Sequence, residues 1–187
     1  WLLKMCDKHK IKTKPGTIDI GIRYELLDEV MEEINKYLYE GKFIGKPNPF
    51  NDKVRTFCQN PSGFVTTEVY DEGLTLVNGH SCKDIKSSNT NLALLVSLNL
   101  KNVDNPMEYS RKIAKNMNTL AGGNVLVQRL GDIWQGKRTW SEELENNQVN
   151  PTLTSATAGD IGLAMPYRVL TDILEFIKQM DKVAPGF

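Results

Sequence analysis

The sequence predicts an α+β fold in which an antiparallel β meander or barrel-like sheet packs against several helices. Three observations support this fold class. Apolar and polar residues alternate in short runs, turn-forming residues separate these runs, and later apolar residues recur at helical spacing. Because most of the strands precede most of the helices, α+β is favoured over alternating βαβ units with a parallel sheet.

The strands are predicted from alternation and from turn chemistry. The first lies at 18–22, where isoleucines alternate with Asp, Gly and Arg. Three short runs follow at 53–59, 63–70 and 74–78, and the turn sequences Asn-Pro-Ser-Gly and Asp-Glu-Gly between them indicate an antiparallel meander. A further run at 92–100 is almost wholly apolar, which predicts a strand covered on both faces.

The helices are predicted where apolar residues repeat at helical spacing. One follows the first strand at 26–38, with acidic residues on its other side. The clearest start is Asn105, which can cap the free amide groups of a helix whose first residue is Pro106. The expected buried stripe of this helix is Tyr109, Ile113, Met117 and Leu120. Further helices are predicted from the capping box at 139–142 through about Asn146, and from near Pro166 onward.

Composition limits the classes of partner and compartment. A chain of 187 residues suits a single domain, 1–187, and equal numbers of basic and acidic residues, 23 each, argue against a nucleic-acid partner. No apolar run approaches the roughly 18 residues of a membrane span, and three widely spaced cysteines form no disulfide framework. We therefore expect a soluble cytoplasmic domain. Because Trp1 opens what looks like a helix already in progress, we also expect it to be excised from a longer chain.

The glycine motifs exclude some chemistry. No Gly-x-Gly occurs, so the dinucleotide-binding fingerprint is absent. The segment 131–138 resembles a phosphate-binding loop, but Arg138 stands where Ser or Thr would ligate magnesium. A short helix followed by basic residues is the better interpretation, and a nucleotide hydrolase is the lesser alternative. Arg129, Lys137 and Arg138 can hold a carboxylate or phosphate, although an ion-paired surface is the simpler interpretation.

His80 is the first candidate catalytic residue. It follows the turn dipeptide Asn78-Gly79 at the end of a predicted strand, where side chains often point into clefts. Histidine is the natural general acid or base near neutral pH, although a turn histidine without chemistry is the simpler alternative.

Cys58 is the second candidate catalytic residue. It lies in a predicted strand whose alternation divides its residues between two faces. One face carries Arg55, Phe57 and Gln59, and the other carries Thr56, Cys58 and Asn60. A nearby cation would make Cys58 a reactive thiol, whereas a small buried apolar residue is the alternative.

Several segments, in this order, resemble a poorly characterised bacterial family of FAD-dependent dehydrogenases. The similarity runs from about Asp19 to the last residue. The segments that carry it are 52–63, 77–81, 89–96, 127–129, 166–174 and 181–186, which include Arg-Thr-Phe-Cys-Gln-Asn-Pro-Ser-Gly, Val-Asn-Gly-His-Ser and Val-Gln-Arg.

The resemblance implies a particular place for this domain. It is expected to be the inserted middle domain of a split Rossmann-type flavoprotein, on the substrate side, with the FAD-binding segments outside both ends. Its partners are then the FAD-binding domain of the same chain and a small-molecule substrate, and the fragment alone would be inactive. In such enzymes the cofactor carries the redox chemistry and the protein orients the substrate.

The family pattern itself assigns no catalytic residue, and the residues that we expect to face the substrate are our own prediction. The blocks 55–63 and 78–81 are expected to form the pocket wall, with His80 and Cys58 in catalytic roles. The expected substrate-binding residues are Arg55, Asn60, Asn78, Gly79, Ser81, Gln128, Arg129 and Arg138. The alternative from another class is a non-catalytic ligand-binding or protein-interaction module. A Gly-x-Gly-x-x-Gly turn after a strand upstream would favour the enzyme over the module.

Overall fold

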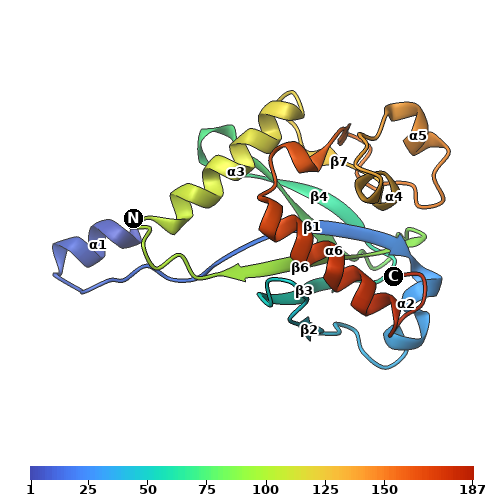
Figure 1. Cartoon of the computed structure of the whole chain (residues 1–187), viewed down its shortest axis with the longest axis horizontal. Helices are drawn as coiled ribbons and strands as arrows, with labels where there is room; N and C mark the ends of the chain where they lie inside the picture. Colours follow the sequence, from blue (N-terminus) through green and yellow to red (C-terminus); the bar gives the residue numbers. More distant parts are fainter.

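A computed structural model describes all 187 residues and shows a mixed α+β architecture. Its main sheet has four antiparallel strands in the order β1 (Ile18–Leu27), β6 (Asn89–Leu98), β3 (Lys53–Asn60) and β2 (Ile44–Gly45) (Figure 1). The predicted fold class is confirmed. The barrel-like closure is wrong, because β1 and β2 do not pair and the sheet remains open.

The predicted meander is only partly correct. The strands β4 (Phe64–Val69) and β5 (Thr75–His80) pair as an antiparallel hairpin around the short helix η1 (Asp71–Gly73). The preceding strand β3 does not pair with β4, since its neighbours are β6 and β2. The chain therefore leaves the main sheet after β3, and the hairpin forms a second sheet packed against it.

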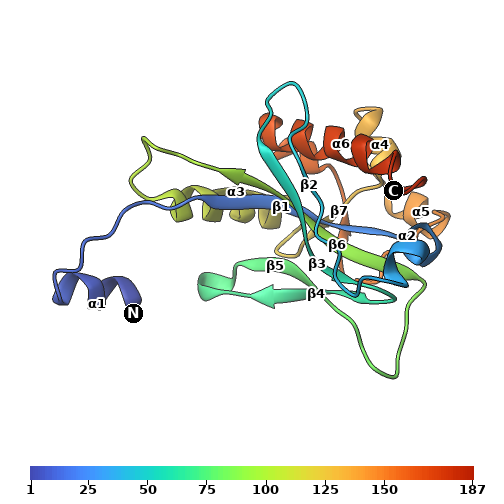
Figure 2. The same cartoon turned by 90° about the horizontal axis from the view of Figure 1, so that it is seen from below.

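The core lies between the main sheet and the last helix, α6 (Tyr167–Asp181). Figure 2 shows α6 on one side of the sheet and the β4–β5 hairpin on the other. The apolar stripe predicted for this helix is confirmed, because residues such as Ile173 and Ile177 are fully buried against Leu94 and Val96 of β6. The sheet is therefore covered on both faces, as the apolar composition of β6 predicts.

The remaining elements lie at the edges of these layers. The N-terminal helix α1 (Leu2–Lys8) has no buried residue and lies apart at the end of an extended segment (Figure 1). Helix α2 (Asp28–Asn35) follows β1 directly. The segment between α3 (Pro106–Leu120) and α6 holds β7 (Leu126–Val127), α4 (Leu130–Trp134), α5 (Ser141–Glu145), β8 (Thr157–Ala158) and η2 (Ile161–Leu163).

Helix α3 begins as predicted but buries a different stripe. The side chain of Asn105 accepts a hydrogen bond from the Glu108 amide at 3.2 Å, which is the expected cap. Tyr109 and Leu120 are exposed, so the predicted stripe is wrong at both ends. The face that turns inward contains Ile113 and Met117, which pack against the edge of the core and also border a cavity.

A β-bulge in β3 reverses the predicted alternation of that strand. Phe57 pairs with Ala93 and Asn60 with Asn91, so one extra residue lies between them on β3, and Cys58 adopts a φ of 47°. Asn60 consequently shares a face with Phe57, opposite to prediction. Gln59 turns to the other side, where its Nε2 donates to Asn35 at 2.5 Å.

No helix of this chain is both long enough and apolar enough to cross a lipid bilayer.

Candidate functional site

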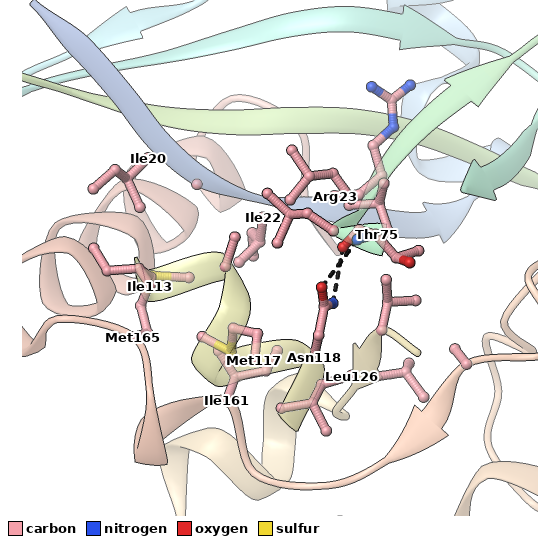
Figure 3. Close-up of a pocket in the computed structure, with 18 of the residues that line it drawn as sticks. Ile20, Ile22, Arg23, Thr75, Ile113, Met117, Asn118, Leu126, Ile161 and Met165 are labelled. Carbon is pink, nitrogen blue, oxygen red and sulfur yellow. Dashed lines mark hydrogen bonds between the residues drawn. The ribbon is translucent and has the colours of Figure 1, made fainter. Parts of the chain in front are cut away.

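A largely apolar cavity of about 470 Å³ lies beside the edge strand β1. Its walls come from β1, the β4–β5 hairpin, helix α3 and the segment around β7, as Figure 3 shows. Ile22, Ile113 and Met117 point into it from two of these walls. A cavity of this size, with few polar groups in its wall, has the character of a small-molecule site.

Asn118 is one of the polar residues that line the cavity, and it ties α3 to the hairpin. Its Nδ2 donates to the Thr75 carbonyl at 2.8 Å, and its Oδ1 accepts from the Thr75 amide at 3.0 Å (Figure 3). The same Nδ2 donates to the Asn124 carbonyl at 2.8 Å. Asn118 therefore fixes the distance between two walls of the cavity.

A polar cluster centred on Arg23 lies next to the cavity, between the main sheet and the hairpin. The stem of Arg23 lines the cavity, but its guanidinium points away from it in Figure 3. Nε donates to Asn91 Oδ1 at 2.7 Å, and Nη2 donates to the Cys58 carbonyl at 2.6 Å and to Asn60 Oδ1. The bulge in β3 brings both of these last acceptors onto the face of Arg23.

All the hydrogen-bond acceptors of Arg23 are uncharged. Burial lowers the pKa of Arg23, while the neighbouring Cys58 side chain and the more distant charge of Glu25 act in the opposite direction. A guanidinium nevertheless remains protonated in proteins. Its Nη1 forms no hydrogen bond within the protein, so one arm of the cation retains its donors.

Two further features characterise the cluster, namely a close approach of the backbone at Gly79 and an amide donor of Asn91 that has no partner. A Cβ atom on Gly79 would lie 2.0 Å from both Arg23 Nη2 and Asn91 Oδ1, so a larger residue at this position of β5 would have to displace these side chains. Asn91 is fully buried, and its Nδ2 has no hydrogen-bond partner. A fully buried amide donor without a partner is unusual in a folded protein.

The structure brings together several residues of the two blocks that the sequence singles out. The Cys58 thiol lies 3.7 Å from Asn60 Oδ1, 3.9 Å from Asn78 Oδ1 and 3.9 Å from the Gly79 carbonyl. The Ser81 hydroxyl donates to the Pro61 carbonyl at 3.1 Å, which joins the same two segments farther along. The blocks 55–63 and 78–81 are therefore neighbours around Arg23.

His80 and Arg55 lie outside this cluster. His80 is exposed at the end of β5, and its side chain has no hydrogen-bond partner in the protein. Arg55 pairs with Asp19 at 2.7 Å and lies over the Phe57 ring, 4.9 Å from its centroid. Their predicted roles as catalytic residue and anion anchor remain predictions.

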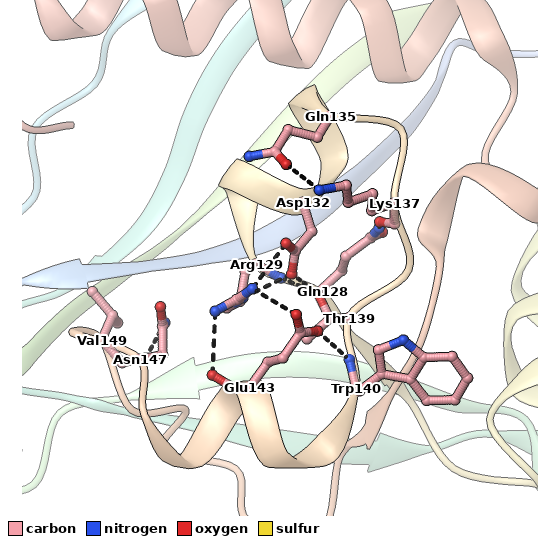
Figure 4. A network of polar contacts seen from close by, with 10 residues as sticks. All are labelled: Gln128, Arg129, Asp132, Gln135, Lys137, Thr139, Trp140, Glu143, Asn147 and Val149. Atoms are coloured by element: carbon pink, nitrogen blue, oxygen red, sulfur yellow. Dashed lines mark hydrogen bonds and ion pairs between the residues drawn. The ribbon is translucent and has the colours of Figure 1, made fainter.

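The basic segment after β7 forms a separate, internally paired network (Figure 4). Arg129 donates to the two oxygens of buried Asp132 at 2.7 and 2.9 Å and also contacts Glu143 at 3.2 Å. The hydrogen bonds from Arg129 lower the pKa of Asp132. Gln128 donates to the Lys137 carbonyl at 2.7 Å, whereas Arg138 stacks on Trp140 at 4.3 Å from the ring centroid. This network corresponds to the ion-paired alternative for the segment.

Sequence reasoning missed Arg23 and Asn91. Arg23 belongs to the alternating run of the first strand, so the pattern places it on the polar face, where an arginine attracts no notice. Asn91 immediately precedes the apolar run at 92–100, where a polar residue reads as the end of a strand. The two come together only because β1 and β6 are adjacent and the hairpin covers this face.

The turn between β7 and α4 does not fit the dinucleotide part of FAD. Such cofactors bind where a glycine-rich turn leads from a parallel strand into a helix. The parallel pair here is β7–β8, with two residues in each strand, and β7 leads into α4 through Gln128 and Arg129. The buried carboxylate of Asp132 occupies the first turn of α4, where it would repel a pyrophosphate. The turn between β7 and α4 is therefore not a dinucleotide site.

Comparison with known protein families agrees with the resemblance of the segments. A family model described as FAD-dependent protein, C-terminal domain-like, matches residues 18–187, from the first residue of β1 to the end of the chain. Curated proteins provide no match. Since the matched region includes the sheet, the hairpin, the cavity and the Arg23 cluster, the chain belongs to the FAD-dependent protein, C-terminal domain-like family.

Proposed function

We propose that this domain forms the substrate-facing wall of an FAD-dependent oxidoreductase of the dehydrogenase type. The flavin is held mainly by other segments of the same polypeptide. The observation that carries the proposal is the apolar cavity of about 470 Å³, which lies within the family-matched residues. Its volume falls in the range of roughly 300–1,000 Å³ that small-molecule sites occupy.

The division of labour follows from what the chain offers. The cavity can enclose the apolar body of a substrate, and Asn118 supplies a fixed amide group beside it. The β7–α4 turn is unsuited to a pyrophosphate, which supports a flavin site built from other segments. We propose further that this domain is inserted into a split Rossmann-type domain. The family description, which places it toward the C-terminal side, makes the order of the segments a point to test.

The first experiment compares the visible absorption spectrum of the complete parent protein with that of this chain after incubation with FAD. We expect flavin bands in the parent protein and none retained by residues 1–187. Flavin retained by this chain would contradict the division of labour. A parent protein that takes up no flavin even after reconstitution would support a non-catalytic binding module instead.

The second experiment fills the cavity. Ala114 lines the cavity from α3, so the ring introduced by Ala114→Phe should occupy part of that space. In the complete protein we expect the flavin bands to persist and flavin reduction by substrate to weaken by about tenfold or more, because a bulky ring blocks the site. The readout is the concentration of substrate that gives half the maximal reduction rate.

The matched control is Asn116→Phe, on the exposed side of the same helix. It introduces the same side chain two positions away without entering the cavity. Equal effects of the two variants on substrate reduction would show that the cavity is not the substrate pocket, whatever their effects on stability.

A further inference from the structure

We propose that the cavity beside β1 binds an extended, uncharged peptide-like ligand, which pairs as an added strand with the backbone of Gly21. The N–H and C=O of Gly21 orient the ligand, and an apolar side chain of the ligand fills the cavity. The inference deepens the proposed function and rests on it only for the identity of the ligand as the substrate. The substrate then carries an amino-acid residue with an amide on each side.

The first argument is the free edge of β1. This strand is the outermost one of the main sheet and pairs with β6 alone. In an antiparallel sheet the backbone groups of successive residues point alternately to the two sides of their strand. Every second residue of β1 therefore directs its N–H and C=O away from β6, to a side on which no other strand pairs.

The register of the sheet shows that Gly21 is one of these residues. The Thr56 amide of β3 donates to the Phe43 carbonyl at 2.9 Å, on the side of β2, so the odd-numbered residues of β3 bond to β6. Their partners on β6 are also odd-numbered, which leaves its even-numbered residues to bond to β1. These pair with even-numbered residues of β1, so Gly21 faces the free edge. Neither its N–H nor its C=O forms a hydrogen bond within the protein.

The second argument is that Gly21 lines the cavity. It is half-buried and has no side chain, so the atoms that it presents to the cavity belong to the backbone. Residues from both faces of β1 also line the cavity, with Ile20 on the face of α6 and Arg23 on that of the hairpin (Figure 3). A cavity bordered by both faces of one strand lies at the edge of that strand, to which the backbone groups of Gly21 point.

The packing of β1 on β6 keeps this position free of a side chain. A Cβ atom on Gly21 would lie 1.9 Å from the carbonyl oxygen of Leu94 and 2.8 Å from its carbonyl carbon. These are backbone atoms of the central strand, which cannot move aside as the end of a flexible side chain can. Glycine within a strand is typical of places where another backbone or a ligand approaches closely.

The charged residues of the cavity wall favour an uncharged ligand. Asp19 is paired with an arginine at 2.7 Å, and Glu25 accepts from a backbone amide at 3.1 Å. The guanidinium of Arg23 points away from the cavity, and Arg111 is exposed, so that water solvates its charge. An ion in the apolar interior would therefore find no counter-ion, at a cost that an uncharged ligand avoids.

The two free groups of Gly21 define the class of ligand. In an antiparallel pair, the N–H and C=O of one residue bond to the C=O and N–H of the residue opposite. A single trans amide cannot supply both partners, because its own N–H and C=O point in opposite directions. The matching unit is an amino-acid residue with an amide on each side, as in peptides that add a strand to a sheet edge. Ile113 and Met117, which point into the cavity, suit an apolar side chain on that residue.

The first test is an NMR titration of the complete protein with N-acetyl-leucine methylamide. Isoleucine labelled with ¹³C at its carbonyl and glycine labelled with ¹⁵N together select the amides of Gly21, Gly45 and Gly162 in this domain. The Gly21 signal is the one that Ile20→Val removes. We expect the Gly21 amide proton to shift downfield on binding, because it gains an acceptor, and the other two to stay unchanged. Binding without a shift at Gly21, or no binding, would overturn the proposal.

The matched control is the ester analogue of the same ligand, in which an oxygen replaces the N–H of the leucine. It keeps the shape and the carbonyl that accepts from Gly21, but it loses the donor to the Gly21 carbonyl. We expect its affinity to be lower by about two- to tenfold, which corresponds to the usual contribution of one hydrogen bond. Equal affinities of the amide and the ester would contradict strand addition.

The variants of α3 test whether the ligand lies in the cavity. Ala114→Phe should abolish the shift at Gly21, whereas Asn116→Phe, on the exposed side of the helix, should leave it unchanged. A shift that persists in Ala114→Phe would place the ligand outside the cavity and contradict the proposal. None of these measurements involves the flavin, so failure of this inference is distinguishable from failure of the proposed function, which the absorption spectrum reports.

Discussion

At the scale of single residues, the Arg23 cluster depends on a glycine as much as on its polar side chains. Gly79 occupies the point where the hairpin approaches Arg23 and Asn91 most closely. Turn chemistry indicated Gly79 as part of a turn dipeptide and the resemblance indicated it as a substrate-binding residue, whereas the structure places it inside β5. Its role depends on packing between two sheets, and no local pattern can reveal such a contact.

Replacing Gly79 should therefore disturb the cluster. We expect Gly79→Ala to lower the free energy of unfolding by about 1–3 kcal/mol, because the new methyl group displaces Arg23 or separates the hairpin from the sheet. Urea unfolding measures the change. The control is Gly131→Ala in α4, where nothing lies within 4 Å of the added Cβ and helix propensity favours alanine by up to about 1 kcal/mol. Similar losses in both variants would contradict this account.

The candidate site was only partly predictable for the same reason. Cys58, Asn60, Asn78 and Gly79 were indicated by the segments that resemble the family, and the structure brings them together. Arg23 was not indicated, because its significance comes from the neutral acceptors that surround it and not from its own position. Partners distant in sequence decide such a role.

At the scale of elements, two neighbouring carboxyl groups lie where helix α6 meets the start of β3, namely Asp172 on α6 and Asp52 just before β3. Asp172 on α6 is fully buried, and neither of its oxygens has a hydrogen-bond partner when it is ionised. Burial and the neighbouring charge of Asp52 raise the pKa of Asp172 to about 6. Asp52 in turn pairs with Arg168 on α6, and hydrogen bonds from Arg168 lower the pKa of Asp52.

This pair predicts that the domain loses stability as the pH rises through about 6. The pKa of Asp172 is raised by folding, so its contribution is fully present below about pH 4 and is lost once the folded protein releases the proton. We expect the free energy of unfolding to fall by up to about 3 kcal/mol between pH 4 and pH 8. Urea unfolding across this range measures it.

Asp172→Asn should remove most of this dependence, since the amide keeps the shape of the protonated acid. The control is Asp104→Asn, a change at an exposed carboxylate in the loop before α3, which should leave the slope as it is. A pH dependence that persists undiminished in Asp172→Asn would show that another group is responsible.

The elements themselves were largely predictable, but their arrangement was not. Helical spacing identified α6, and the cap at Asn105 identified the start of α3. The alternation in β3 failed at its bulge, because one inserted residue exchanges the faces of every residue that follows. The pairing of β3 with β6 also escaped prediction, since the turn residues favoured pairing with the next strand in sequence.

At the scale of the whole molecule, the ends of the chain contribute unequally to the fold. Helix α1 has no buried residue, and the family match begins at residue 18, where β1 starts. The C-terminal residues instead join the core: Phe187 is buried, and its ring centroid lies 5.3 Å from that of Tyr24. The two termini should therefore respond differently to truncation.

We expect deletion of residues 1–17 to change the melting temperature by less than about 2 °C, because no core contact is removed. Deletion of residues 182–187 should lower it by about 5–10 °C, since it removes the buried side chains of Ala184 and Phe187. Thermal unfolding monitored by circular dichroism provides both values. A large loss from the first deletion would mean that α1 packs on the domain in solution.

The neutral surroundings of Arg23 also determine how the site responds to acidity. A cation held by a carboxylate changes its character when that carboxylate takes up a proton, but the backbone and amide oxygens around Arg23 do not titrate. The positive charge is therefore the same in an acidic and in an alkaline solution, as long as the domain stays folded. Any change of this cluster with acidity would then come from other groups, and not from the arginine.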